Sequence, residues 1–79
     1  MSTIEDISGM KDVKIRFGER LRELRIEKGW SQETLANLAD IDRTYLPGIE
    51  NGKRNVSLVI IEKLSIVFNM SISDLIKGI

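Results

Sequence analysis

The chain has 79 residues, enough for one small domain, and it contains neither cysteine nor histidine. Disulfides and thiolate metal sites are therefore excluded, and the commonest general base is absent, so we expect no enzyme activity and no cofactor. The 12 basic and 12 acidic side chains cancel, so any attraction to nucleic acid must come from a local cluster of charge.

Residues 1–10 have no strong periodicity and include Gly9, so we expect a flexible leader before a single domain at residues 11–79. They also lack the basic and hydrophobic regions of an export signal, and no later apolar run is long enough to span a bilayer. The expected location is the cytoplasm, with no membrane partner.

The first predicted helix runs from about Asp12 to Lys28, because its apolar residues recur at helical spacing. These residues, Val13, Phe17, Leu21 and Leu24, form one stripe along the helix. Gly29 stands where such a helix would end in a left-handed residue, and we expect Trp30, which follows, to anchor the core.

Residues 31–51 predict two short helices that meet at a tight corner. Ser31 is a good N-cap for a helix from Gln32 to Ala39, and Asp40 follows where the chain must turn sharply. Asp42 is a candidate N-cap for the second helix, which Asn51 and Gly52 would end.

Pro47 would stand fifth in that second helix if Asp42 were its N-cap. Proline lacks the N–H group that would bond back one turn, and its ring crowds the carbonyl group of Arg43. We therefore expect some distortion of the second helix.

The last part of the chain predicts two more helices. Ser57 is a plausible N-cap for the apolar run LVIIEKLSIVFN, which Asn69 would end, and Ser71 with Asp74 opens a short final helix. No segment alternates like a strand, so the predicted fold is an all-α orthogonal bundle of five helices. The predicted core consists of Phe17, Leu21, Leu24, Leu35, Ala36, Ala39, Leu46, Ile49, Leu58, Ile61 and Leu64.

These motifs resemble a known family. Ala36 is the small residue that a helix-turn-helix needs where its helices cross, and the pair of helices is similar to that of Cro/cI-type (XRE) DNA-binding proteins. The string from Arg20 to Ser57 more narrowly resembles the controller proteins of restriction-modification systems, especially in DRTY, GIE and KRN. This resemblance implies a five-helix bundle of the lambda-repressor-like DNA-binding type. Asp40, where the family usually has Gly, and Pro47 depart from the pattern.

The resemblance implies that the second motif helix enters the major groove of DNA. Its outward N-terminal residues, Asp42, Arg43 and Thr44, are then the expected base contacts. Arg43 is the strongest candidate because its guanidinium group can bond both O6 and N7 of guanine. The alternative for Arg43 is an ion pair with Asp42 or Asp40.

Phosphate contacts would flank the base contacts and fix the position of the protein on DNA. The expected residues are Ser31, Gln32, Tyr45, Asn51, Lys53, Arg54 and Asn55. For Tyr45, packing is the alternative. Arg25 and Glu50 match a structural pair of the family that ties the first helix to the recognition helix.

One such helix covers only a few base pairs, so we expect a homodimer on a two-fold operator. The apolar residues near the C-terminus exceed what a small core needs, although several could simply cover that core. The expected interface consists of Ile60, Val67, Met70, Ile72, Leu75, Ile76 and Ile79.

The predicted function is a sequence-specific DNA-binding transcriptional regulator, and the resemblance implies the controller of a restriction-modification system. A phage-type repressor or an antitoxin is the nearest alternative. A protein interaction module that keeps the fold without binding DNA is a second alternative, which the zero net charge permits. Double-stranded DNA is the expected partner, and no small-molecule ligand is expected.

Overall fold

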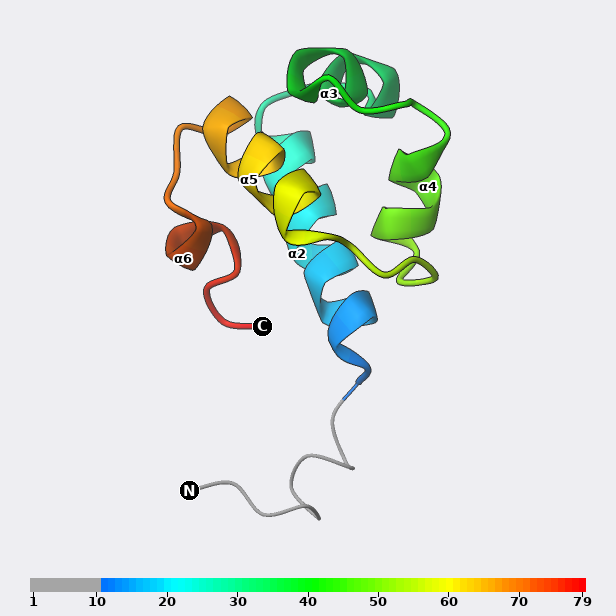
Figure 1. Ribbon diagram of the computed structural model, residues 1–79, viewed down its shortest axis with the longest axis vertical. Helices are drawn as coiled ribbons and strands as arrows, with labels where there is room; N and C mark the ends of the chain where they lie inside the picture. The colour runs from blue at the N-terminus through cyan, green and yellow to red at the C-terminus, as the bar shows by residue number, and fades with distance from the viewer. Residues whose placement is uncertain (1–10) are drawn as a thin grey trace.

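The computed structural model describes residues 11–79, which form five α-helices and no strand. These are α2 (Val13–Glu27), α3 (Gln32–Ala39), α4 (Tyr45–Glu50), α5 (Leu58–Val67) and α6 (Ile72–Leu75). Figure 1 shows α3 across one end of the long α2 and α4 along one side of it, while α6 lies on the other side and α5 packs against α3 and α6. The all-α prediction with five helices is confirmed, and the predicted leader, residues 1–10, lies outside the described part.

Serine hydroxyl groups mark the start of three helices. Ser31, Ser57 and Ser71 each accept a hydrogen bond, at 3.0 to 3.1 Å, from the backbone N–H group three residues further on. Each hydroxyl satisfies one of the N–H groups that a helix leaves unpaired in its first turn. The three serine caps predicted from the sequence are therefore confirmed.

The corner between α3 and α4 depends on the left-handed conformation of Asp40, whose φ is 54°. The N–H group of Ile41 reaches back to the carbonyl oxygen of Ala36 at 2.9 Å, which closes the end of α3. Ile41 then turns into the core. Aspartate can adopt this conformation at a modest cost, so its place at a usual glycine position is compatible with the corner.

The second helix of the predicted pair, α4, begins later than the sequence predicts. Asp42 does not cap α4; its carboxylate accepts hydrogen bonds from the backbone N–H and the hydroxyl group of Thr44, and α4 begins at Tyr45. An earlier start would require a bond from Pro47 to the carbonyl of Arg43, which proline cannot donate. Pro47 is instead the third residue of α4. An N–H group at this position has no partner within the helix, so proline fits there without the distortion that we expected.

The core contains most of the predicted residues. Phe17, Leu21, Leu24, Leu35, Ala36, Ala39, Leu46, Ile49 and Leu64 are buried, together with Ile41, Phe68 and Leu75. The ring of Trp30 packs on that of Phe68 at 5.5 Å between centroids, as expected of an anchor.

Leu58 is the clear error in the predicted core, because 75% of its surface is exposed, and Ile61 is only half-buried. Helix α5 is apolar on most of its circumference, so periodicity alone did not determine which side packs inward. Contacts with α3 and α6 determine it, and they leave Leu58 outside.

Helix α4 sits on α2 at a position that only glycine can occupy. A Cβ atom on Gly18 would lie 2.5 Å from the carbonyl oxygens of both Ile49 and Glu50. The C-terminal end of α4 therefore rests directly on the backbone of α2. This close approach fixes α4 against α2, the longest helix of the described residues.

Candidate nucleic-acid interface

A buried ion pair holds α4 in place from below. Arg25 of α2 donates two hydrogen bonds to the carboxylate of Glu50, at 2.7 and 3.0 Å, and a third to the carbonyl oxygen of Trp30 at 2.8 Å. The Glu50 side chain is only 3% exposed. The hydrogen bonds to Glu50 raise the pKa of Arg25 above its already high ordinary value, so this pair stays charged.

Gln32 joins the same network. Its amide nitrogen donates to the Glu50 carboxylate at 3.1 Å, which ties the first turn of α3 to the end of α4. One amide N–H and the amide oxygen of Gln32 remain for other partners. The network thus links α2, α3 and α4 through a single carboxylate.

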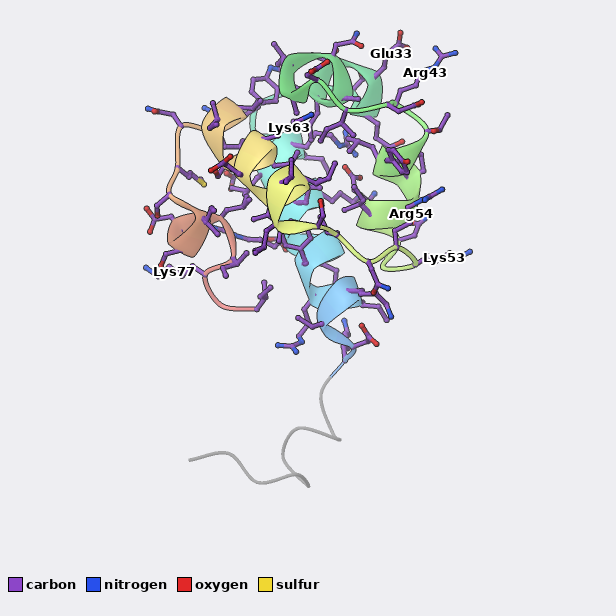
Figure 2. All side chains as sticks on the ribbon, viewed as in Figure 1. Glu33, Arg43, Lys53, Arg54, Lys63 and Lys77 are labelled. Atoms are coloured by element: carbon purple, nitrogen blue, oxygen red, sulfur yellow. The ribbon has the colours of Figure 1, made fainter. Side chains whose placement is uncertain are left out.

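The turn that leads into α4 presents its polar residues to solvent. Arg43 is exposed, and its guanidinium group lies 3.8 Å from the carboxylate of Glu33 on α3, a different partner from the two aspartates that the sequence offered. Figure 2 shows these two labelled side chains next to each other at the edge of the molecule. Nothing in the local sequence predicted this pair, because the corner at Asp40 brings the two residues together.

Asp42 and Thr44 interact with each other in the free protein. The hydrogen bonds from the backbone and the hydroxyl group of Thr44 hold the pKa of the Asp42 carboxyl group below its ordinary value. The carboxylate of Asp42 therefore remains charged and keeps the turn before α4 closed.

The loop after α4 carries a second group of cations. Asn51, Lys53, Arg54 and Asn55 are all exposed, and the guanidinium carbon of Arg54 lies 4.6 Å from the centroid of the Tyr45 ring. Tyr45 therefore packs against Arg54 while its ring stays partly exposed. Figure 2 places Arg43, Lys53 and Arg54 on the same side of the molecule, and Lys77 on the opposite side.

Lys63 is a further contact that the sequence analysis missed. Its ammonium group donates a hydrogen bond of 3.0 Å to the carbonyl oxygen of Asp40, so α5 holds the corner of the helix-turn-helix from behind. The pairing spans 23 residues, and no local pattern could have revealed it.

The predicted dimer residues divide into two groups. Leu75 is fully buried in the core of the single chain, so its assignment to an exposed interface was wrong. The others are partly buried, and five of them pack against the core: Ile60, Val67, Met70, Ile76 and Ile79. Ile72 is partly buried as well. The large apolar side chains that α5 leaves exposed are Leu58, Val59 and Ile66, at 63 to 75% of their surface.

The described part of the chain offers no metal centre, since residues 11–79 contain no group of three or more side chains arranged to hold a metal ion. Nor does any helix in that range have the length and hydropathy to cross a membrane.

Residues 21–75 match the helix-turn-helix family. The control protein C.MunI of Mycoplasma sp is 54% identical over 71 residues, which cover 89% of this chain and 96% of that protein. The crystal structure of the restriction-modification controller protein C.AhdI from Aeromonas hydrophila superposes with a TM-score of 0.75 at 53% identity, over 78% of this chain and 94% of that one. The crystal structure of SinR in complex with DNA superposes with a TM-score of 0.72 at 35% identity, over 77% of this chain and 98% of the SinR chain.

Proposed function

The chain belongs to the helix-turn-helix family of DNA-binding transcriptional regulators, and from this premise we propose that it is the controller protein of a restriction-modification system. The similarity to C.MunI extends over almost the whole of that control protein, and it exceeds the similarity to SinR by a wide margin. That difference favours a controller over a regulator of another kind in the same family, such as SinR.

The observation that carries the DNA-binding role is the exposed cationic side of α4. Arg43 stands just before the N-terminus of α4, and Lys53 and Arg54 follow its C-terminus on the same side (Figure 2). A helix fits the major groove, and residues at its N-terminal end reach the base edges in this motif. The net charge of zero is therefore compatible with binding, because the cations are concentrated where the groove would lie.

Arg43 is the proposed base-reading residue, with Thr44 and Asp42 beside it. To reach a guanine, Arg43 must leave Glu33, but the two groups are exposed and 3.8 Å apart. Breaking such a surface pair costs at most about 1 kcal/mol, whereas a good contact with guanine gives about 1 to 3 kcal/mol of discrimination. The exchange of partners is therefore favourable at the correct base.

The proposed phosphate contacts lie at the ends of the two motif helices. Ser31 and Gln32 stand at the N-terminus of α3, where unpaired N–H groups and the helix dipole favour an anion. Because Glu50 occupies one amide N–H of Gln32, the other amide N–H would reach the phosphate. The second set of proposed phosphate contacts consists of Asn51, Lys53, Asn55 and the hydroxyl group of Tyr45.

We further propose that two copies act together on a two-fold operator. Val59 and Ile66 are seven residues apart and so lie on the same face of α5, and Leu58 adjoins them. Three exposed large apolar side chains on one short helix are best covered by a second copy of the same helix. In this proposal the centre of the interface lies on α5 rather than on the partly buried residues near the C-terminus.

The test is selection of bound duplexes from a random DNA pool at low and moderate salt, with Lys77→Ala as the control on the opposite side. We expect a two-fold motif whose half-sites are about one helical turn apart or a multiple of it, and the same motif for the control. Affinity should fall with salt, because phosphate contacts release counterions. If no sequence is enriched even at low salt, the proposal fails.

A further inference from the structure

The end of α4 folds back on the helix itself. Gly52 is left-handed, with φ at 72°, and the N–H group of Lys53 donates to the carbonyl oxygen of Gly48 at 2.9 Å. The N–H group of Gly52 donates to the carbonyl oxygen of Ile49 at 3.1 Å, which completes a Schellman ending. The N–H group of Arg54 also reaches Gly48, at 3.3 Å. The backbone of Arg54 is therefore fixed next to the middle of α4.

The side chain of Arg54 lies along α4 from that point. A Cβ atom on Gly48 would lie 3.0 Å from Cγ of Arg54 and 3.1 Å from both Cδ and Nε. The guanidinium carbon then lies over the ring of Tyr45, three residues earlier and thus on the same face of the helix. Arg54 occupies the space that a side chain at position 48 would fill.

The backbone does not need glycine at position 48. Gly48 is not among the residues with a positive φ, and glycine within a helix is less favourable than alanine. What Gly48 supplies is room for the stem of Arg54. The part of the recognition helix that carries no polar side chain of its own, Pro47 and Gly48, thereby acquires a guanidinium group from the loop.

Within residues 11–79, no side chain pairs with the guanidinium donors of Arg54, so these donors can meet a ligand. None of the ion pairs within residues 11–79 involves Arg54. Stacking on the face of the Tyr45 ring uses the plane of the guanidinium group and leaves its N–H edges available. The paired N–H donors of a planar guanidinium group, held on the face of a groove-binding helix, match the paired acceptors O6 and N7 of guanine.

We propose that Arg54 is a second base-reading residue, which contacts a guanine opposite the middle of α4, and that Gly48 is the positioning residue that makes this contact possible. The inference rests on the proposed function and changes the role of Arg54 from a loop contact with phosphate. Arg43 would read one guanine of each half-site, and Arg54 would read another.

The experiment measures affinity for the duplex selected by the wild type and for a panel of duplexes that each differ from it by one base pair. The proteins are the wild type, Arg54→Ala, Gly48→Ala, Gly48→Leu and the matched loop control Lys53→Ala. Thermal unfolding of each variant is followed in parallel.

Arg54→Ala should lose about 5- to 150-fold of discrimination at one guanine in each half-site. Gly48→Leu should lose the discrimination at that same guanine, and Gly48→Ala should lose part of it. Neither Gly48 variant should unfold at a lower temperature than the wild type. Lys53→Ala should weaken binding to every duplex by the same factor.

Two results would overturn the inference and leave the proposed function standing. In the first, Arg54→Ala weakens binding to all duplexes equally, as Lys53→Ala does, and Arg54 is a phosphate contact. In the second, both Gly48 variants keep the wild-type base preferences, so the position of Arg54 does not depend on Gly48. If the wild type itself distinguishes none of the duplexes, the proposed function and this inference both fall.

Discussion

Removing the carboxylate of Glu50 should destabilise the domain more than any other single loss of charge in the described structure. In Glu50→Ala, the guanidinium group of Arg25 loses two hydrogen bonds and its counter-ion while remaining largely buried, at 14% exposure. Breaking a buried pair from one side typically costs about 3 to 5 kcal/mol. A domain of this size has about 4 to 12 kcal/mol of stability in total. We therefore expect the unfolding temperature to fall by about 12 to 40 °C.

The assay is urea unfolding followed by circular dichroism, with the free energy of unfolding taken by linear extrapolation. Glu19→Ala is the matched control, because its partner Lys11 is 3.0 Å away but both side chains are exposed. The free energy of unfolding of Glu19→Ala should fall by less than about 1 kcal/mol. The double variant Arg25→Leu with Glu50→Leu should regain much of the stability, since no charge is left buried. If Glu50→Ala loses no more than Glu19→Ala, the reasoning about this network is wrong.

Three further predictions concern the core, the dimer and pH. In urea unfolding, Leu64→Ala should lower the free energy of unfolding by about 2 to 5 kcal/mol and Leu58→Ala by less than about 0.5 kcal/mol, because Leu64 is fully buried and Leu58 is exposed. Equal losses would contradict the packing of α5. Ile66→Asp should shift sedimentation from dimer to monomer without unfolding the chain, and a monomeric wild type would contradict the dimer. Because hydrogen bonds lower the pKa of Asp42 in the folded protein, its stabilising effect is present above the pKa of the unfolded chain and is lost as pH falls through the folded value. The stability difference between wild type and Asp42→Asn should therefore shrink below about pH 4, and a difference that is constant with pH would refute this.

The helix boundaries that could be predicted were those set by local chemistry. Ser31, Ser57 and Ser71 each bond within three residues, and Asp40 needs only its own left-handed conformation to turn the chain. The start of α4 was predicted too early, although Pro47 carried the necessary information. A proline that cannot bond back to Arg43 delays the helix instead of distorting it.

The arrangement of side chains around the site depended on contacts between distant residues. Glu33 meets Arg43 because of the corner, and Arg54 lies on Tyr45 because the chain folds back at the end of α4. Such contacts leave no periodic pattern in the sequence. The pairing of Arg25 with Glu50 was anticipated only through the resemblance to a family.

The orientation of α5 could not be predicted for a different reason. Its apolar residues surround the helix, so Leu58 looked suited to the core, and Leu75 of α6 looked suited to an interface. In the folded chain Leu58 is exposed and Leu75 is buried. A periodic pattern identifies an inward face only when the other face is polar.

The central claim is that Arg43, just before the N-terminus of α4, reads the sequence of duplex DNA. The most direct test compares wild type and Arg43→Ala on the selected duplex and on a scrambled duplex at two salt concentrations. The account predicts that Arg43→Ala loses about 5- to 150-fold in affinity for the selected duplex. Binding to the scrambled duplex, which rests on phosphate contacts, should change little and should retain its dependence on salt. An equal loss on both duplexes, or no loss on either, would contradict the claim.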